Sequence, residues 1–245
     1  MFSFFKKSNT NFENLQIDFH NHILPGIDDG AKDENDAHIL RIALKERGFE
    51  KCIYTPHIYE EIHPNTPEII LNAYNILFEN SNYTTEFNND TYAAEYMLDE
   101  SFKKKIEINT ELLCIKNKKV LIEFSTLQLP FFAEETIFKL RLLGYTPIIA
   151  HPERYNYMYN NPQSNLSFTQ LKDMGCEFQL NLLSLIGMYG DKSKQASIYL
   201  LKNQLYDYAA TDVHNSFHLR SLDKLIHSTI WNKWNKYPFK NHNLI

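Results

Sequence analysis

The chain has few of the features that mark secreted, membrane-spanning or nucleic-acid-binding proteins. Its 245 residues contain three cysteines, an odd and scattered set that predicts no disulfide framework and indicates a reducing compartment. The formal net charge of −5 lacks the basic excess of a nucleic-acid-binding surface. No apolar run is long enough to cross a bilayer, and the opening MFSFFKK lacks the hydrophobic core of a signal peptide. We therefore expect a cytoplasmic protein with no integral membrane segment and no nucleic-acid partner.

Pro/Ser-rich linkers and internal repeats are also lacking. Hydrophobic residues make up 43% of the chain, which is enough to bury one large core. We predict an N-terminal segment over residues 1–15, interpreted as a mobile or docked terminus, and a single domain over residues 16–245. The sequence carries no signal of oligomeric state.

Four apolar runs each reach a histidine, a pattern expected where strands deliver imidazoles to a metal site. These runs are IDFHNH at 17–22, TPH at 55–57, AHPER at 150–154 and TDVH at 211–214. Two runs carry potential ligands at positions i and i+2, His20 with His22 and Asp212 with His214. In a strand this spacing puts both side chains on one face, so one cation can bind both. A surface or core histidine explains any single run, but not the combination.

Two glutamates interrupt other apolar, strand-like runs. Glu95 lies in YAAEYML and Glu123 in VLIEFS, where an unpaired carboxylate would be costly to bury. Lys118 and Lys119 precede the second run in a turn-like segment. A cation supplied from solution is therefore the simpler partner for both carboxylates.

The spacing of these residues predicts an α/β fold. The intervals between successive strand ends are similar, except that the last interval is about twice as long. An additional strand without a ligand is expected inside this long interval, and the run CEFQLNL at 176–182 fits that position. Most gaps are long enough for a crossover helix. We predict a seven-stranded β/α barrel with strands near 16–20, 51–55, 92–96, 120–124, 146–150, 177–181 and 207–211. Every candidate ligand would then lie at the carboxyl end of a strand, where barrels carry their functional residues.

Helices are predicted between the strands. One follows Asp33 and stops at Gly48, one starts at Thr66 and Pro67, and one covers 134–143. The expected buried stripe of the second helix consists of Ile69, Ile70, Ala73, Ile76 and Leu77. The segment LLCIKNKKVLIEF predicts a β-hairpin, because two apolar runs flank a polar turn.

Arginine use indicates phosphate binding. Arg154 follows His151 by three positions and Arg220 follows His214 by six, so each could reach over the site. A planar guanidinium binds two phosphate oxygens at once. A surface salt bridge is the alternative for Arg220. The other arginines, Arg41, Arg47 and Arg141, lie in predicted helices and are expected to be structural.

Two covalent phosphatase mechanisms are excluded. A cysteine-based tyrosine phosphatase needs Cys-x5-Arg, but Ile58, Val120 and Leu182 occupy the positions six after the three cysteines. An aspartyl-phosphate mechanism needs a second Asp two residues after the nucleophile, and Asp18 is followed by Phe19 and His20. We expect Asp18 to orient a ligand histidine instead.

The motifs DFHNHILPGIDDG, YTPH, AAEYML, LIEFS, IAHPERY and TDVHN, in this order, resemble those of the polymerase and histidinol phosphatase (PHP) superfamily. More narrowly, they resemble its bacterial manganese-dependent protein tyrosine phosphatases of capsule and exopolysaccharide biosynthesis. The resemblance implies a distorted seven-stranded β/α barrel, TIM-like and of the PHP type, that holds three divalent metal ions. The ions are most readily manganese, with iron or zinc as alternatives.

The resemblance also implies roles for individual residues. The first metal would bind His20, His22, Glu95 and Asp212; the second Glu95, Glu123 and His151; and the third Asp29, His57 and His214. Asp28 is a rival to Asp29. Arg154, Arg220 and Asp212 would be catalytic, with a metal-bridged hydroxide attacking phosphorus.

The implied substrate is phosphotyrosine, on the tail of a bacterial tyrosine kinase that regulates polysaccharide synthesis and could recruit the protein to the membrane. Histidinol phosphate is the rival substrate, because the same metal constellation serves both. Two other functions stay open. One is a metal-stabilised module that binds phosphotyrosine without cleaving it. The other is an amidohydrolase, which would usually use a metal-bridging lysine, although no strand-end lysine is evident.

Overall fold

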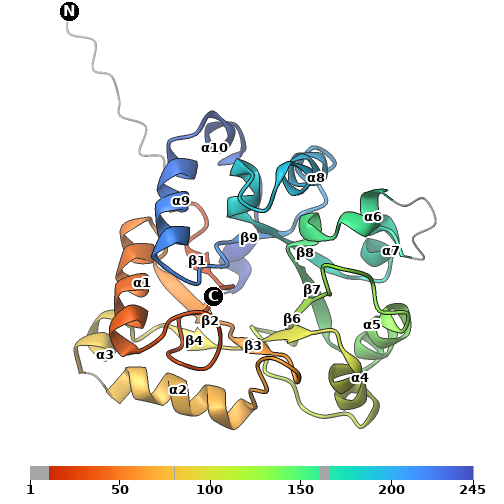
Figure 1. The fold of residues 1–245 in the computed structure, drawn as a ribbon, viewed down its shortest axis with the longest axis horizontal. Coiled ribbons are helices and arrows are strands. Elements are labelled where there is room, and N and C mark those ends of the chain that lie inside the picture. The colour runs from red at the N-terminus through yellow and green to blue at the C-terminus, as the bar shows by residue number, and fades with distance from the viewer. Residues whose placement is uncertain (1–10, 80, 161–165, 245) are drawn as a thin grey trace, which may run out of the picture.

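The computed structural model describes residues 11–79, 81–160 and 166–244. Parallel strands lie at the centre and helices surround them, an α/β arrangement (Figure 1). The first ten residues of the predicted N-terminal segment, including the apolar MFSFF, lie outside the described residues. Within the described residues, no helix has both the length and the apolar character needed to cross a bilayer.

The strands form two sheets in which every neighbouring pair is parallel. One sheet has the order β1-β2-β4 and the other the order β3-β5-β6-β7-β8-β9. The bounds are β1 Ile17–Asp18, β2 Lys51–Tyr54, β3 His57–Ile58, β4 Thr91–Tyr92, β5 Glu95–Met97, β6 Lys119–Glu123, β7 Thr146–Ala150, β8 Glu177–Asn181 and β9 Tyr208–Ala210.

The prediction of a closed seven-stranded barrel is not confirmed, because two predicted strands are each broken into two pieces. The strand predicted at 51–55 continues past Pro56, which has no N–H to donate, and resumes as β3 in the other sheet. The strand predicted at 92–96 breaks between β4 and β5 in the same way. An isolated parallel bridge pairs Asn21 with Val213, just beyond β1 and β9.

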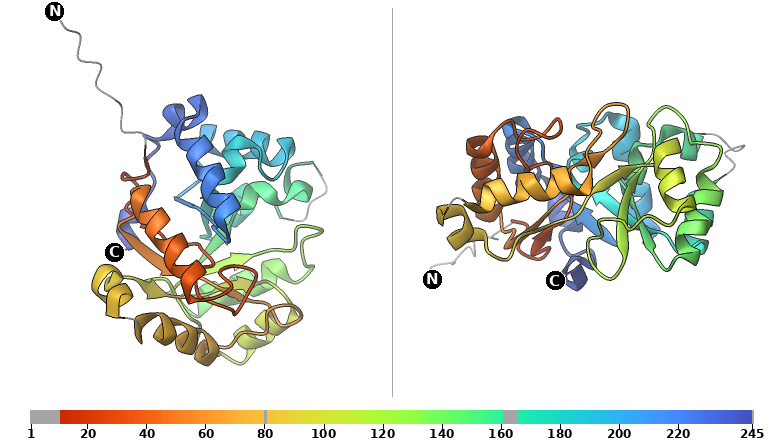
Figure 2. Two further views of the ribbon diagram at one scale, coloured as in Figure 1. Left: turned by 60° about the vertical axis from the view of Figure 1, so that its left-hand side comes forward. Right: turned by 90° about the horizontal axis from the view of Figure 1, so that it is seen from below.

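The helices cover the outside of both sheets (Figure 2). Their bounds are α1 Glu34–Glu46, α2 Pro67–Glu79, α3 Ser81–Phe87, α4 Glu100–Glu107, α5 Ala133–Leu142, α6 Asn156–Asn160, α7 Phe168–Asp173, α8 Asp191–Lys202, α9 Ser216–Ile226 and α10 Thr229–Trp234. Short 3-10 helices are η1 Pro152–Arg154, η2 Leu182–Ile186 and η3 Asn241–Leu244.

The apolar core has two parts because the side chains of a strand alternate between its faces. In β6, Val120 and Ile122 pack outward into the large cluster under the helices, whereas Leu121 joins a smaller cluster enclosed by the strands. The smaller cluster also draws residues from β1, β2, β7 and β9. This packed interior fills the space behind the polar site.

The predicted helices are present, with one correction. Asp33 caps α1 by accepting a hydrogen bond from the backbone N–H of Asp36. In α2, Ile70, Ala73 and Leu77 are buried, but Ile69 and Ile76 are 40% and 45% exposed. The stripe is therefore narrower than predicted, because α2 contacts the core along one side only.

The predicted β-hairpin is wrong. Residues 111–114 form no strand, and only β6 of the proposed pair is extended. The backbone N–H of Ile115 donates to the carbonyl of Lys119, so the polar segment closes a local turn without a paired strand before it. Leu113 is held by a tyrosine instead, since its N–H donates to the hydroxyl of Tyr96.

Residues 11–15 pack against the rest of the domain. Phe12 and Leu15 are fully buried, and Phe12 contacts the rings of Phe49 and Trp231. This part of the predicted N-terminal segment therefore contributes to the same core as the chain after residue 16.

Candidate metal centre

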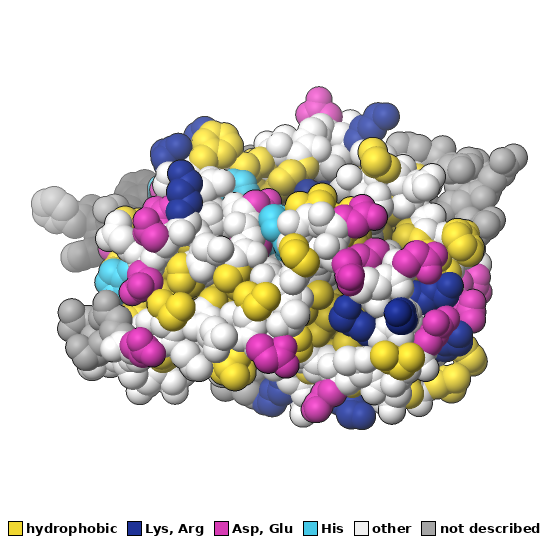
Figure 3. All heavy atoms as spheres, turned by 60° about the horizontal axis from the view of Figure 1, so that its bottom comes forward, with side chains coloured by type: hydrophobic (Ala, Val, Ile, Leu, Met, Phe, Trp, Pro, Cys, Tyr) yellow, Lys and Arg dark blue, Asp and Glu magenta, His cyan; other side chains and the backbone are white. Residues whose placement is uncertain are grey.

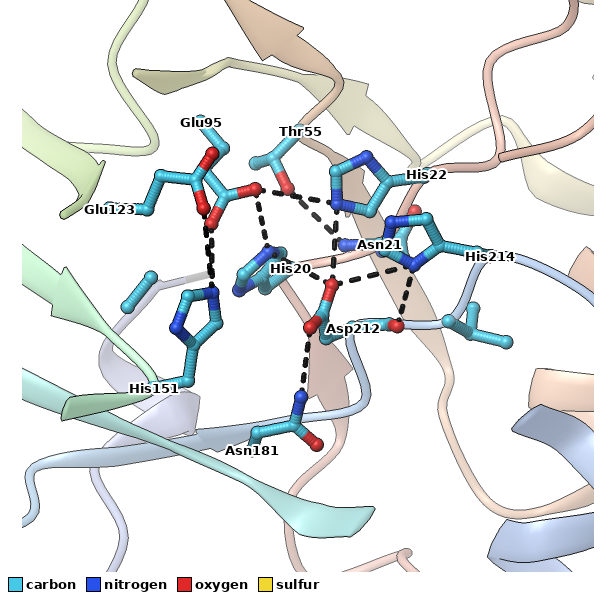
Figure 4. Close-up of polar contacts among 12 residues, drawn as sticks. His20, Asn21, His22, Thr55, Glu95, Glu123, His151, Asn181, Asp212 and His214 are labelled. Carbon is cyan, nitrogen blue, oxygen red and sulfur yellow. Dashed lines mark hydrogen bonds and ion pairs between the residues drawn. The ribbon is translucent and has the colours of Figure 1, made fainter. Parts of the chain in front are cut away.

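All nine predicted ligands lie together, and most of them are at or just beyond the carboxyl end of a strand. His20 and His22 follow β1, His57 opens β3 and Glu95 opens β5. Glu123 ends β6, and the remaining ligands come from loops after β7, β9 and β1: His151, Asp212, His214 and Asp29. Most of these side chains point toward one another in Figure 4.

Short distances connect the three predicted ligand sets. The Nε2 atom of His20 lies 3.1 Å from Glu95 Oε2 and 3.3 Å from Asp212 Oδ1. Asp29 Oδ1 lies 3.3 Å from His214 Nε2 and 3.6 Å from His57 Nε2. The other ring nitrogen of His57, Nδ1, lies 3.1 Å from both Glu95 and Glu123, so His57 stands between two parts of the cluster.

Four overlapping groups of these residues are close enough to hold a metal ion, with one potential ligand atom per residue within 4.8 Å of the others. The groups are His22-Asp29-His57-His214, His20-His22-Glu95, His20-His151-Asp212 and His57-Glu95-Glu123. Together they use all nine predicted ligands. The overlap at Glu95 is the arrangement expected where a bridging carboxylate serves more than one ion.

Buried atoms without hydrogen bonds support the fit of a metal at this position. Within the described residues, these atoms include Nε2 of His20 and His22, Nδ1 of His57 and both carboxylate oxygens of Glu95. Leaving such groups unpaired in a buried site is costly. Imidazole and carboxylate donors without thiolate suit manganese, iron or zinc.

The electrostatics of the cluster demand positive charge. Burial alone would lower the pKa of His20, but the carboxylates of Glu95 and Asp212 outweigh it and raise that pKa above its ordinary value. Burial alone would raise the pKa of Glu95, but His20 and His57 hold it well below its usual range. The same balance, led by His20 and His214, lowers the pKa of Asp212. The imidazoles and carboxylates thus stabilise one another's charged forms.

Three histidines are oriented by a hydrogen bond from Nδ1, which leaves Nε2 facing the cluster. The acceptors are Gln179 Oε1 for His20 at 3.0 Å, Asp28 Oδ2 for His22 at 2.8 Å and the carbonyl of Asp212 for His214 at 2.9 Å. Metal-binding histidines are typically held this way by an oxygen acceptor. The second nitrogen is thereby fixed as the one that can bind a metal.

Gln179 was missed by the sequence reasoning, which treated strand 177–181 as free of site residues. Its side-chain oxygen also accepts a hydrogen bond from the backbone N–H of His151, at 3.1 Å. The available signal was the pair Gln179 and Asn181 at i and i+2 in an apolar run, which places both amides on one face of β8.

Asp18 does not orient a ligand histidine as predicted. Its carboxylate accepts hydrogen bonds from the backbone N–H and the hydroxyl of Thr211, at 2.9 and 2.6 Å. Asp18 therefore ties the end of β1 to the end of β9, next to the ligands that follow both strands.

Asp28 and Asp29 have separate positions. Asp28 is directed inward and also accepts a hydrogen bond from the backbone N–H of His57, at 3.2 Å, whereas Asp29 faces the ring nitrogens of His57 and His214.

The loop that carries Asp28 and Asp29 folds back onto the end of the strand, since the backbone N–H of Ala31 donates to the carbonyl of His22. A Cβ at Gly30 would lie 1.9 Å from that carbonyl oxygen, so this approach requires glycine.

The backbone is strained at two of the candidate ligands. His151 has a φ of 33° and Asp212 a φ of 52°, in the left-handed region that residues with a side chain rarely adopt. Both lie where a strand turns sharply at its carboxyl end. Such strain persists only where the surroundings enforce it, and it concentrates at functional sites.

Arg154 lies beside the cluster. Its Nη1 lies 3.2 Å from Asp212 Oδ2, an oxygen that also accepts from the side-chain amide of Asn181 at 2.8 Å. The guanidinium carbon is 4.5 Å from the ring centroid of Tyr189. Glu153, the neighbouring residue, is fully buried and accepts from the backbone N–H of Asn181 at 2.9 Å. Arg154 is therefore attached to a rigid turn.

Arg220 has a different environment from Arg154. It is exposed on α9, where it donates to the hydroxyl of Ser216 and lies near the ring of Phe217. The structure thus does not bring it against the candidate ligands. Of the arginines predicted to be structural, Arg41 is fully buried and binds both carboxylate oxygens of Asp90.

The cluster opens into a cavity of about 450 Å³. Its wall includes candidate ligands together with Arg154, Tyr189, His63 and His218. His63 stacks on His57 with 5.3 Å between ring centroids, and His218 Nδ1 accepts from the backbone N–H of His214. These two histidines were not predicted as ligands, but they line the mouth of the site.

The fold and the cluster together define an α/β protein with His/Asp/Glu groups able to bind metal ions. The chain belongs to the capsular polysaccharide synthesis family CpsB/CapC, whose model matches residues 16–228. It is 31% identical over 209 residues to the tyrosine-protein phosphatase YwqE of Bacillus subtilis, an alignment that covers 81% of this chain and 77% of YwqE. It is 30% identical over 208 residues to the tyrosine-protein phosphatase CpsB of Streptococcus pneumoniae, covering 81% of this chain and 83% of CpsB.

Solved structures agree with this assignment. The fold matches a crystal structure from a study of YwqE from Bacillus subtilis and CpsB from Streptococcus pneumoniae, described there as unique metal-dependent tyrosine phosphatases, with a TM-score of 0.72 and 27% identity over 92% of this chain and 94% of that chain. A 2-pyrone-4,6-dicarboxylic acid hydrolase from Acinetobacter baumannii matches with a TM-score of 0.51 and 11% identity, over 93% of this chain and 96% of that one. The second likeness concerns the fold alone.

Proposed function

We propose that this chain is a metal-dependent protein tyrosine phosphatase. The observation that carries the proposal is the close grouping of nine imidazoles and carboxylates, all buried or partly buried except Asp29, most of which line one cavity with a guanidinium at its wall. The membership of the CpsB/CapC family and the likeness to named tyrosine phosphatases supply the reaction.

The proposed ligands follow the three sets expected from the sequence. His20, His22, Glu95 and Asp212 hold one divalent ion, Glu95, Glu123 and His151 a second, and Asp29, His57 and His214 a third. Nδ1 of His57 lies 3.1 Å from both Glu95 and Glu123, so this nitrogen offers the histidine an alternative place in the second set. Manganese is the proposed ion, with iron and zinc as alternatives. When bound, such ions act as Lewis acids that activate water and stabilise charge on phosphoryl oxygens.

The residues of the chain bind and orient the phosphate. Arg154 points into the cavity and donates two N–H groups to phosphate oxygens, which offsets the charge that builds up on them. Asp212 fixes Arg154 through one carboxylate oxygen and faces His20 and His22 with the other. Asp212 thus couples the proposed phosphate-binding group to the proposed metal ligands. Cys52 and Cys176 are buried and have raised pKa values, so neither provides a thiolate nucleophile.

The proposed physiological substrate is the phosphotyrosine-containing tail of a bacterial tyrosine kinase in capsular or exopolysaccharide synthesis. The family description and the names of the relatives support this context. Binding to such a kinase would also bring the protein to the membrane surface.

Hydrolysis of p-nitrophenyl phosphate tests the proposal. We expect activity with manganese, loss of activity with a chelator and recovery when manganese is restored. A phosphotyrosine peptide and histidinol phosphate are then compared at matched concentration. A tenfold or greater preference for histidinol phosphate would overturn the proposed substrate, and inactivity of the metal-loaded protein on every ester would favour a binding module.

A further inference from the structure

A second hollow, of about 840 Å³, adjoins the metal cavity. Tyr59 and Met97 line both, so the two spaces share a wall. We name the second one the flanking groove. Its lining falls into three stretches of chain: 59–61, 97–108 and 125–132. These stretches directly follow the strand ends that carry His57, Glu95 and Glu123, so the segments that build the groove also deliver three of the candidate ligands.

Apolar side chains dominate the accessible surface of the flanking groove. Phe131 is 90% exposed and Ile108 is 68% exposed, whereas Leu98 and Phe132 are buried beneath them. The ring of Phe131 packs edge-on against Phe132 with 5.2 Å between centroids. Exposed apolar groups gathered in one hollow mark binding sites more often than scattered ones do. Figure 3 shows, on the face seen there, histidine side chains at the surface with apolar and acidic side chains around them.

The polar groups of the groove are largely engaged with one another. Ser101 donates to Glu60 and accepts from Lys105 Nζ at 2.8 Å. Asp99 caps α4 by accepting from the backbone N–H of Phe102 at 2.7 Å. These side chains already have partners, so they compete less with the apolar walls for an incoming chain.

We propose that the flanking groove binds the polypeptide next to the phosphotyrosine, with an aromatic or aliphatic side chain of the substrate against Phe131 and Ile108. This inference rests on the proposed function. The metal cavity accommodates the phosphorylated ring, and the groove begins at the wall of that cavity, so a chain leaving the ring enters the groove. A small phosphate ester would leave the groove empty. The substrate class is therefore a phosphotyrosine with an apolar neighbour in an extended segment.

Peptide kinetics test the proposal. Two phosphotyrosine peptides of equal length and charge are compared, one with leucine and phenylalanine beside the phosphotyrosine and one with serine and glycine there. We expect kcat/KM to be at least tenfold higher for the apolar peptide. The variants Phe131→Ser and Ile108→Ser should remove most of this preference by raising KM, and should leave the hydrolysis of p-nitrophenyl phosphate unchanged.

A matched control and a binding measurement complete the design. Leu142 is 71% exposed on α5 and does not line the groove, so Leu142→Ser should leave both peptide rates unchanged. The Kd of a non-hydrolysable phosphonate analogue of the apolar peptide is measured by fluorescence anisotropy, independently of turnover. We expect Phe131→Ser to weaken it about tenfold.

The outcomes separate the two proposals. If p-nitrophenyl phosphate is hydrolysed but neither the flanking residues nor the variants alter peptide kinetics, the groove has no role in substrate binding and the proposed function stands. If the metal-loaded protein hydrolyses nothing, the proposed function fails, and the anisotropy measurement still decides whether the groove binds a peptide. If Phe131→Ser instead changes the sedimentation of the protein and leaves peptide binding intact, the groove is a contact between copies of the chain, and the inference is wrong.

Discussion

The guanidinium of Arg154 lies against the ring of Tyr189 while one of its nitrogens reaches Asp212. The hydroxyl of Tyr189 accepts a hydrogen bond from the side-chain amide of Asn181, which also donates to Asp212. Tyr189 is thus a positioning residue: it completes a ring of contacts that holds the arginine over the cavity. Nothing in the sequence motif around Arg154 indicates this partner, because Tyr189 lies after a different strand.

Substitutions at Arg154 and Tyr189 should have different kinetic effects. Arg154→Ala should lower kcat/KM for p-nitrophenyl phosphate about 100-fold, because a charge-stabilising donor is lost. Tyr189→Ala should mainly raise KM, since the guanidinium remains but loses its support. Tyr189→Phe keeps the ring and should stay within about threefold of the wild type. Equal losses in Tyr189→Ala and Tyr189→Phe would show that the ring contact is not what positions Arg154.

The proposed ligand Asp212 can be tested against a histidine outside the site. Asp212→Ala should abolish turnover and reduce bound metal, measured by elemental analysis, while circular dichroism shows the fold retained. His227 is exposed at the end of α9, so His227→Ala should change neither quantity. Comparable losses in both variants would mean that the site has been assigned wrongly.

The two adjacent aspartates should differ in metal content. Asp29→Ala removes a proposed ligand and should lower the number of ions bound per chain without a large loss of stability, because Asp29 is exposed over 58% of its side chain. Asp28→Ala removes an acceptor used by His22, Gly30 and His57, so it should lower both the melting temperature and metal binding. The reverse pattern would make Asp28 the ligand.

Gly30 should not tolerate a side chain. Gly30→Ala places a Cβ against the carbonyl of His22, and relieving that overlap should cost roughly 1–3 kcal/mol of unfolding free energy. The displaced loop should also bind metal more weakly. Urea denaturation of the metal-free protein and metal titration measure the two effects separately. A variant as stable as the wild type would show that the loop moves freely away from the strand end.

Asp207 should make stability depend on pH away from the metal centre. Burial acts to raise its pKa, but hydrogen bonds from Lys172 and Lys240 outweigh burial and hold the pKa below the ordinary 3.8. The stabilisation is therefore fully present above pH 3.8 and is lost as the pH falls through the lower pKa of the folded state. Asp207→Asn should cost about 1–2 kcal/mol at pH 7, since Lys240 is half exposed, and the gap to the wild type should shrink in acid.

Denaturation of both proteins between pH 7 and pH 3 measures this gap. Asp223, paired with Arg47 at 2.7 Å and half exposed, provides the comparison, because Asp223→Asn should change stability by less than about 0.5 kcal/mol at any pH. A gap for Asp207→Asn that does not narrow in acid would contradict the assignment of its lowered pKa.

Much of the fold could be predicted from the sequence because an ionisable residue follows or interrupts most of the apolar runs. These residues marked the positions of the strand ends. The regions predicted as strands all contain strand residues, and the helix starts at Asp33 and Pro67 are observed. The change from one sheet to the other after Tyr54 and after Tyr92 could not be predicted, since it depends on how the two sheets meet. The hairpin was predicted wrongly because an apolar run at 112–115 packs against Tyr96 and the core rather than against a neighbouring strand.

The residues of the site also differ in whether they could be predicted from the sequence. His20, His57, Glu95, His151 and Asp212 could be found because ionisable side chains stand out at the end of apolar strands. Gln179, Asn181 and Tyr189 could not be found with the same ease, because an amide or a tyrosine in an apolar segment is not an ionisable metal ligand. Their contribution depends on contacts between strands that are distant in sequence, which only the three-dimensional arrangement reveals.

The donors of the cluster span the chain from His20 to His214. A polypeptide emerging from the ribosome therefore cannot assemble the complete set until most of it has been synthesised. Truncated products would capture ions poorly and would carry their acidic and imidazole groups without a partner. A complete metal centre would therefore require a chain that extends at least to His214.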